Sequence, residues 1–505
     1  RCTVRIEPLV KHVSEVVKLM KNDALGCPGN EPISREAASM VQMKYAKQST
    51  LEQIFNDHPK LYESSNELLW ATSELAVEVL HCSVHQARSL DPVIDFEDMI
   101  YMPVMVSTKV DLPKYPLIVI DEAQDMNAVR LDLVYSMLSV DGIVVFVGDP
   151  NQCIYGFTGS TKTVMESAVA RFSAATVKLT TTFRCSVAVV NATNVYFDKY
   201  SEYLHDFAFR ARDGADAGLV VHNASFITNP IGDAIGDVAV LSRKTAPLVM
   251  LYFNFVKRNT PVKFLGRETL GKQMAETFEK IVTDNIKTID EVVTSLALYH
   301  MSFDLMPSSP SSNEEARNRV EALLGLTRVM KELNPNATTE DVRKRIMDFT
   351  SSVDDADGVV LSTVHKAKGQ EYYTVYILAP EDLPLKSTME TGAQWEKENE
   401  VGCGYVALTR AKHTLIMLQT VETVKDLFEL PAIDCGEDGA PVIPAPLEAA
   451  SVSAVPATVR ATSAATDLFE LPAVDGGEDG AALASKASVI AAPLDAASVR
   501  AVPAT

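Results

Sequence analysis

Five short apolar runs, each closed by polar or acidic residues, constrain the fold of this chain most strongly. They are rich in β-branched residues and are separated by stretches with helical character. They cover residues 116–120, 142–147, 359–364, 374–378 and 414–418. Continuous apolar runs of this length are typical of strands in a parallel sheet with both faces covered by helices. The sequence therefore predicts an α/β fold, and ligands of such folds bind beyond the carboxyl ends of the strands.

Size and composition limit the class of protein further. A chain of 505 residues is long enough for two or three domains, and 47% hydrophobic and 22% charged residues fit a soluble globular protein. The seven cysteines include no C-x-x-C pair, so neither a disulfide framework nor a zinc site is indicated. There is no signal peptide and no apolar run of about 18 residues. We expect a nuclear or cytoplasmic protein that is neither secreted nor membrane-embedded.

The net charge of −21 argues against a generally basic surface for nucleic acid. Any nucleic acid must therefore bind in a local groove. Part of the acidity lies in the last segment, where residues 421–505 hold 13 acidic and 4 basic side chains. The rest of the chain is less acidic than the total implies.

The segment 421–505 differs in composition from everything before it. It is rich in Ala, Pro, Ser and Val, and the sequence of 426–434 (DLFELPAID) returns at 467–475 as DLFELPAVD. Two copies are too few for a solenoid, and such a segment buries too little apolar surface to offset its ordering entropy. It is predicted to be a disordered tail. The alternative is that each repeat is a short docking motif for a protein partner.

The run at 116–120 ends in Asp121 and Glu122, followed by Ala-Gln-Asp. An apolar strand that ends in Asp-Glu is the pattern of a Walker B motif. Its Asp holds Mg²⁺, usually through water, and its Glu orients or deprotonates the attacking water. The alternative is an acidic strand end at a helix N-terminus, where carboxylates are favoured in any case. The pentapeptide alone leaves both interpretations open.

Four further segments follow in a fixed order. They read GDPNQCIYGF at 148–157, TFR at 182–184, TVHKAKGQEY at 363–372 and YVALTRAK at 405–412. Together with 121–125 they resemble motifs II to VI of UvrD/Rep-type superfamily 1 DNA helicases, and their spelling is closest to the F-box DNA helicase branch. The resemblance covers roughly residues 90–420. It implies two RecA-like parallel-sheet motor domains with helical insertions, and ATP and Mg²⁺ as cofactors.

The resemblance also implies roles for single residues in ATP hydrolysis. Asp121 resembles the Mg²⁺ ligand, and Glu122 the catalytic carboxylate. Gln152 resembles the glutamine that senses the γ-phosphate, and Arg184 and Arg410 are similar to the two arginines that reach that phosphate from the second motor domain. Phosphoryl transfer spreads negative charge over the γ-oxygens, so arginines supplied across a cleft would stabilise it.

Two positions in the fourth segment are implied to bind the nucleotide as well. Glu371 resembles the motif V carboxylate that contacts the ribose, and Gly369 belongs to the same short stretch. An isolated ionic residue is more often part of a surface ion pair. The motif context favours the functional interpretation.

The nucleic-acid side of the site is predicted from aromatic and basic residues. Tyr155 and Phe157 occupy alternate positions, and flat rings can stack on successive bases without reading sequence. We favour this role over the alternative, in which both rings belong to the core. His365 and Lys366 match family positions near the DNA backbone, and Lys368 could act likewise. The alternative for the lysines is simple solvation.

Several positions depart from the family pattern. Thr158 stands where an arginine is usual, and Gln370 and Tyr372 replace a leucine and a phenylalanine. Gly402 and Gly404 stand where leucines are usual, and two glycines should weaken a helix. These changes put the efficiency of coupling in doubt more than family membership.

The largest departure is the phosphate-binding motif G-x-x-x-x-G-K-[S/T], which is absent from the 505 residues. The stretch 156–163 (GFTGSTKT) is a near miss, but it has a threonine in place of the second glycine and lies within motif III. The family carries this motif upstream of motif II. We therefore interpret the chain as N-terminally truncated and expect it to hydrolyse ATP poorly or not at all on its own.

The predicted domain organisation follows from these assignments. It comprises a remnant of a helical insertion at 1–110, the end of an incomplete first RecA-like domain at 111–175, the two segments of the second at 176–265 and 351–420, a helical insertion at 266–350, and the tail at 421–505. The predicted function is an ATP-dependent 3′–5′ DNA helicase that translocates on single-stranded DNA and unwinds duplex junctions. The alternative is a catalytically inactive helicase-like protein that binds nucleic acid or a protein partner.

Overall fold

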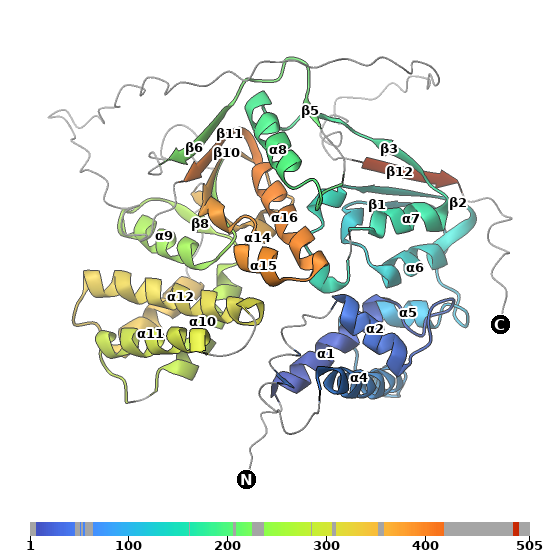
Figure 1. The fold of residues 1–505 in the computed structure, drawn as a ribbon, viewed down its shortest axis with the longest axis horizontal. Helices are drawn as coiled ribbons and strands as arrows, with labels where there is room; N and C mark the ends of the chain where they lie inside the picture. Colours follow the sequence, from blue (N-terminus) through green and yellow to red (C-terminus); the bar gives the residue numbers. More distant parts are fainter. Residues whose placement is uncertain are drawn as a thin grey trace, which may run out of the picture.

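The computed structural model describes residues 7–45, 51, 54–55, 64–160, 162–205, 209–224, 237–283, 285–305, 310–351, 358–418 and 488–493. Two separate sheets carry helices and lie on either side of a central helix, α16 (Gln394–Leu408) (Figure 1). All five predicted runs form strands, so the predicted α/β fold is confirmed. Among the described residues, no helix is long and apolar enough to cross a membrane.

The N-terminal part of the chain is helical. It contains α1 (Glu7–Asn22), α2 (Arg35–Tyr45), α4 (Ser65–Ala87) and α5 (Asp98–Met105), which share a hydrophobic cluster. Lys21 is fully buried between α1 and α5, and its ammonium lies 2.8 Å from carboxylate oxygens of both Asp95 and Asp98. A buried ammonium requires such partners, and this one fixes α5 against α1.

The first sheet follows these helices. Its strand order is β1 (Tyr115–Ile120), β2 (Leu138–Gly148), β12 (Ser488–Pro493) and β3 (Ala175–Lys178). β1 and β2 are parallel, and β12 is antiparallel to both of its neighbours. One face packs against α6 (Ala128–Met137) and α7 (Val164–Phe172), with Phe146 and Phe172 in the centre of that cluster.

The other face of the first sheet is exposed. Leu117 and Val119 on β1 are 56% and 60% exposed, Ile143 on β2 is 45% exposed, and Val177 on β3 is 55% exposed. The prediction of helices on both faces is therefore wrong for this sheet. The apolar pattern was read correctly, but in the described part of the chain no helix packs on this side.

The second sheet has six strands, and every pair of neighbours in it is parallel. The order is β6 (Leu219–Ala224), β11 (Ala411–Leu418), β10 (Tyr372–Leu378), β7 (Val238–Ser242), β9 (Val359–Thr363) and β8 (Val262–Phe264). Alternate residues of its central strands enter two different clusters, and both faces are buried. Helix α8 (Val187–Lys199) and α16 contribute to one cluster, and α9 (Ala246–Lys257) to the other.

Helices also fill most of the range between β8 and β9. They are α10 (Arg267–Ile281), α11 (Ile289–Leu305), α12 (Pro310–Leu333) and α13 (Thr339–Ser351), and they pack with α9. Figure 1 shows them as a separate layer below the second sheet. The tail repeats at 426–434 and 467–475 lie outside the described residues. Within the predicted disordered tail, residues 488–493 instead form β12.

Helix α16 runs without interruption through Gly402 and Gly404, and the expected weakening by these glycines stays a prediction. The two glycines serve close packing. A Cβ on Gly402 would lie 3.1 Å from the carbonyl oxygen of Asn151, and one on Gly404 would overlap the hydroxyl of Tyr196. That hydroxyl donates to the Val401 carbonyl at 3.0 Å. Small residues at both positions therefore let α16 approach the end of β2 and α8.

We expect Gly404→Ala to lower the free energy of unfolding by about 1–3 kcal/mol, because the new methyl group has no room beside Tyr196. Chemical denaturation measures the change. In the double variant with Tyr196→Phe, the loss should be smaller than the sum of the two single losses, because the closest atom is gone. Strictly additive losses would contradict the packing explanation.

Candidate active site

The side chain of Gln124 makes hydrogen bonds to residues at the carboxyl ends of both β1 and β2. Asp121 and Glu122 follow β1 directly, and Glu122 has a left-handed backbone (φ 53°), which is costly for a residue with a Cβ. The Gln124 side-chain amide donates to a Glu122 carboxylate oxygen at 2.6 Å. The Gln124 carbonyl oxygen accepts from the Asp149 backbone N–H at 3.0 Å. The turn after β1 is thereby held in register with the turn after β2.

Arg410 reaches this region from the second sheet. Its side chain is 1% exposed and donates to the carbonyl oxygens of Val406 and Gln370, each at 3.0 Å, and to the Thr409 hydroxyl at 3.1 Å. Its remaining contact crosses between the sheets, where one terminal nitrogen lies 3.4 Å from the Gln152 side-chain oxygen. The guanidinium is therefore fixed by its own domain and directed at Gln152.

Arg184 and Glu371 form an ion pair next to Arg410. The Arg184 Nε donates to a Glu371 carboxylate oxygen at 2.6 Å, and its Nη1 approaches the Thr409 carbonyl at 3.4 Å. Lys412 lies 3.4 Å from the other Glu371 oxygen. Burial raises the pKa of the Glu371 carboxyl, but Arg184 and Lys412 outweigh this and hold the pKa below its usual value. The carboxylate is therefore ionised at neutral pH.

The two arginines repel one another. Burial, together with the charge of Arg184, lowers the pKa of Arg410 to about 10, so its guanidinium is still positive at neutral pH. Arg184 and Lys412 both pair with the single carboxylate of Glu371, and the charge of Arg410 lies close to that of Arg184, so cations outnumber this carboxylate. An anionic group placed between the sheets would relieve this repulsion, and a phosphate matches the geometry of guanidinium groups.

Asp149 accepts hydrogen bonds from uncharged donors in both halves of the site. It is fully buried, and burial raises the pKa of its carboxyl. It accepts from the Asn151 backbone N–H at 3.0 Å and from the Gln152 side-chain amide at 2.9 Å. The Tyr405 hydroxyl of α16 donates to it at 2.9 Å. Asp149 thus orients Gln152 and connects β2 to α16.

Lys368 makes a second link between the halves, through charge. Its ammonium lies 2.7 Å from both carboxylate oxygens of Asp125 and donates to the Gln152 carbonyl at 2.8 Å. The lysine side chain is 6% exposed. The same ammonium lies 4.9 Å from the centre of the Tyr155 ring. In this conformation Lys368 joins the segment after β9 to the ends of β1 and β2, rather than facing solvent.

The predicted nucleic-acid residues lie beside this lysine. The Tyr155 hydroxyl donates to the His365 backbone carbonyl at 3.0 Å. The His365 ring is partly buried, and its Nε2 lies 3.4 Å from the Cys403 sulfur. Burial, with the nearby charges of Arg243 and Lys368, lowers the pKa of His365 to about 3, so the ring is neutral. Phe157 falls in the short helix η3 (Gly156–Thr158), and its side chain lies outside the described part.

Two more predicted residues are placed at the rim of the site. The Lys366 side chain is exposed and donates to the Gly266 carbonyl at 3.3 Å. Gly369 has a left-handed backbone (φ 82°), and a Cβ there would meet nothing within 4 Å. Its backbone conformation favours glycine and places Glu371 two residues later at the start of β10. The assignments of both residues to ligands stay predictions.

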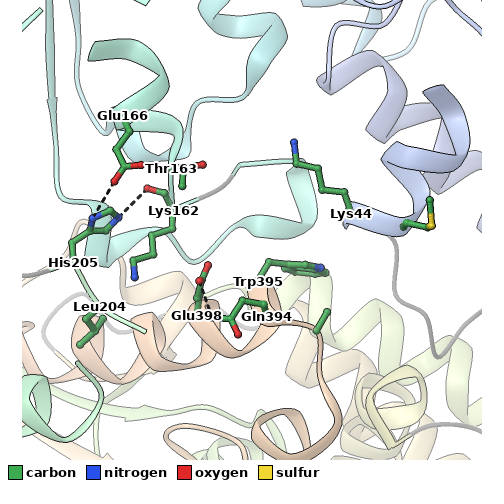
Figure 2. Close-up of a pocket in the computed structure, with 11 residues that line it drawn as sticks. Lys44, Lys162, Thr163, Glu166, Leu204, His205, Gln394, Trp395 and Glu398 are labelled. Carbon is green, nitrogen blue, oxygen red and sulfur yellow. Dashed lines mark hydrogen bonds and ion pairs between the residues drawn. The ribbon is translucent and has the colours of Figure 1, made fainter. Parts of the chain in front are cut away.

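A hollow of about 670 Å³ lies between several segments that are far apart in the sequence. Figure 2 shows Lys44 of α2, Lys162 and Trp395 of α16 among the residues that line it. Glu166 and Glu398 line it too, so its charges are balanced. None of the predicted catalytic residues lines it. Its lining residues come mainly from α2, from the start of α7 and from α16.

Sequence reasoning missed three residues that the structure places in the site: Asp125, Asp149 and Tyr405. All three lie within the recognised motifs, so their positions were visible in the sequence. Their partners were not, because Tyr405 and Asp149 are separated by 256 residues along the chain. The ion pair of the partly exposed Arg243 with the buried Glu400, which holds α16 beside the end of β7, was missed as well.

The two α/β units thus meet where Arg410 of one unit contacts Gln152 of the other. Comparison with known proteins identifies the family. Residues 10–173 match the UvrD/REP helicase N-terminal domain, and residues 159–422 match the UvrD-like helicase C-terminal domain. The chain belongs to the UvrD-like helicases, in superfamily 1.

Individual relatives are distant and longer than this chain. It is 22% identical over 390 residues to the putative ATP-dependent DNA helicase YjcD of Bacillus subtilis, a match covering 60% of the chain and 51% of the relative. It is 23% identical over 455 residues to the ATP-dependent DNA helicase PcrA of Staphylococcus epidermidis, covering 70% and 62%. It is 25% identical over 339 residues to F-box DNA helicase protein 1 of Schizosaccharomyces pombe, covering 64% and 35%. The chain thus spans about a third to two thirds of the length of these proteins.

We expect Lys368→Met to lower the free energy of unfolding by about 2–3 kcal/mol, because it leaves Asp125 partly buried without its countercharge. Asp125→Asn should also destabilise, and the double variant should show a coupling of at least about 1 kcal/mol. Equilibrium denaturation of the four proteins measures it. Lys331→Met is the matched control, since its ion pair with Asp290 is exposed and should contribute less than about 1 kcal/mol. Additive effects at Lys368 and Asp125 would refute the link.

Acid should destabilise the fold through His365. Its pKa is depressed in the folded chain, so the unfolded chain takes up a proton first as the pH falls below about 6.5. Stability is therefore full above that pH and is lost progressively toward pH 3. Between pH 7 and pH 5 this one group should remove about 1.5–2 kcal/mol. Burial also lowers the pKa of His12, to about 4, so His12 should add to the loss of stability as the pH falls.

The variant His365→Gln should lose correspondingly less stability between pH 7 and pH 5 than the parent chain. His81→Gln is the control, because that side chain is exposed on α4. Urea denaturation at the two pH values gives the difference. An identical acid slope in the parent and in His365→Gln would show that the ring is not held neutral.

Proposed function

We propose that this chain is part of an ATP-dependent DNA helicase that moves 3′ to 5′ along single-stranded DNA and opens duplex junctions. The observation that carries the proposal is the cluster of Gln152, Arg184 and Arg410 between the two sheets. It supplies positive charge from one unit opposite the carboxylates of the other, as phosphoryl transfer requires. The direction of movement rests on the family resemblance.

The charged residues of the site fit a nucleoside triphosphate with Mg²⁺. The neighbouring guanidinium groups of Arg184 and Arg410 suit a terminal phosphate, and Asp121 and Glu122 directly follow β1 of the other unit. Among the described residues there is no cluster of three or more side chains able to hold a metal. Mg²⁺ would therefore take Asp121 together with phosphate oxygens and water, which is usual for this ion. The bound nucleotide would supply the cleavable phosphoanhydride.

Each side chain then has a distinct task. Glu122 orients the attacking water, and Gln124 fixes its carboxylate. Gln152, oriented by Asp149, senses the terminal phosphate. Arg184 and Arg410 stabilise the charge that develops on its oxygens, which makes closure of the two units depend on ATP.

The DNA strand would run past Tyr155, with Phe157 as a second stacking ring. Lys366 is exposed and can turn from the Gly266 carbonyl to a backbone phosphate. Tyr155 contacts both His365 and Lys368, and Lys368 contacts Asp125 and Gln152. A base stacking on Tyr155 would thereby act on the ATP side through one lysine.

The test is DNA-stimulated ATP hydrolysis, measured on this chain and on the longest product of its reading frame. We expect turnover only in a product that contains G-x-x-x-x-G-K-[S/T], because the backbone amides of that loop and its lysine cradle the phosphates. Glu122→Gln should reduce that turnover at least 100-fold while single-stranded DNA binding persists.

Arg410→Ala should also reduce hydrolysis, whereas Lys331→Ala on the exposed surface of α12 should leave it unchanged. Strong hydrolysis by the 505-residue chain alone would contradict the need for the cradle. If the longest product lacks the loop and no product hydrolyses ATP, the alternative gains support, and the chain is a binding protein built on a helicase fold.

A further inference from the structure

Trp395, the second residue of α16, lines the hollow of about 670 Å³ and has an unsatisfied polar group. The side chain is half-buried, and its Nε1 is buried without a hydrogen-bond partner among the described residues. A buried tryptophan N–H is normally paired, because an unmade hydrogen bond costs free energy. The unpaired donor therefore indicates a ligand that carries an acceptor.

The indole lies directly against the segment that carries the two predicted base-stacking residues. A Cβ added to Gly156 would lie 2.8 Å from Cε3 of Trp395, so the ring packs against the backbone of Gly156. Gly156 stands between Tyr155 and Phe157 and begins η3. A DNA strand that follows Tyr155 and Phe157 would therefore pass within reach of Trp395.

The charged side chains of the hollow suit a neutral ring with polar edges better than a phosphate. Lys44 and Lys162 line it together with Glu166 and Glu398 (Figure 2). Two carboxylates in the hollow would repel a phosphate group. The edge of a nucleobase carries both acceptors and donors, so it can pair with ammonium groups and carboxylates alike.

We propose that the hollow binds one nucleobase of single-stranded DNA, which stacks on the indole of Trp395, while an oxygen atom of the same strand accepts from Nε1. This inference rests on the proposed DNA-binding function. It adds a third ring to the predicted path of the strand. Tyr155 and Phe157 belong to the first motor unit, whereas Trp395 is supplied by the second, so the bound strand contacts both units through its bases.

Helix α16 connects this base site to the catalytic cluster. The helix ends at Leu408, two residues before Arg410. Along it, Glu400 pairs with Arg243, and the Tyr405 hydroxyl donates to Asp149. Because the helix is continuous, a base held at Trp395 restrains the element from which Arg410 projects.

Tryptophan fluorescence tests the stacking directly, because the chain contains two tryptophans, Trp70 and Trp395. Trp70→Phe leaves Trp395 as the single reporter. Trp395→Phe leaves Trp70, which lies on α4 and is 39% exposed, as the matched control. The full 505-residue chain would be titrated with a single-stranded oligothymidylate. Since a stacked base quenches indole emission, we expect at least about a twofold loss of emission in the Trp70→Phe protein and almost none in the Trp395→Phe protein.

An abasic oligomer of the same length, which has the sugars and phosphates but no bases, is the matched ligand. It should leave the emission of Trp395 nearly unchanged, and equal quenching by both oligomers would overturn base stacking. Binding of the oligothymidylate without quenching of Trp395 would overturn this site alone and would favour a protein partner for the hollow. If the parent chain does not bind the oligothymidylate, the proposed DNA-binding function fails together with this inference.

Affinity gives a second measurement, through the fluorescence anisotropy of a labelled oligothymidylate. Trp395→Ala should raise the Kd about 5- to 150-fold, which corresponds to the loss of one stacked base. Trp395→Phe should retain most of the affinity, because an aromatic ring remains. Trp70→Ala is the control and should leave the Kd unchanged. An unchanged Kd in Trp395→Ala, or an equal loss in Trp395→Phe and Trp395→Ala, would overturn the proposal.

Discussion

The buried guanidinium of Arg410 is the constraint on which the arrangement of the two units depends. A cation that is 1% exposed must be surrounded by acceptors, and three of its four hydrogen-bond partners belong to its own domain. They come from α16 and from the turn before β10, so both elements must meet at one point. Only the contact with Gln152 reaches the other domain, and at 3.4 Å it is the longest. Arg410 is thus held in place by its own domain, whereas its longer contact with Gln152 of the other domain can change more easily.

Two links of different chemistry then join the halves. Asp149 and Tyr405 are joined by a hydrogen bond with an uncharged donor, deep in the protein, where an unmade bond would leave a buried carboxylate short of donors. Lys368 and Asp125 are joined by opposite charges nearer to solvent. The first link sets the distance between β2 and α16. The second is an ion pair, and each of its partners can also pair with other ions.

The positions of the strands could be predicted from the sequence more accurately than the tertiary contacts around them. All five apolar runs became strands, because β-branched side chains fit the pleated surface of a sheet. The short strands β4 (Thr181–Thr182) and β5 (Arg210–Ala211) leave no comparable pattern. The partners of Lys368 lie 216 and 243 residues away, so its place between the sheets depends on tertiary contacts that no local pattern contains. The packing role of Gly402 and Gly404 could not be predicted for the same reason: their cost to the helix is local, whereas the close approach that they permit depends on distant residues.

The departure at Thr158 shows how the loop after β2 is stabilised without the usual arginine. The Thr158 hydroxyl donates to the Tyr155 carbonyl at 2.7 Å, and its own carbonyl accepts from the Asn127 side chain at 3.2 Å. Gly159 then closes the turn in a left-handed conformation. The loop is therefore held by neutral hydrogen bonds and carries one positive charge fewer toward a DNA strand. In the proposed DNA-binding role this loop supplies one phosphate contact fewer, so we expect the affinity of this chain for single-stranded DNA to be less sensitive to salt than that of the variant Thr158→Arg.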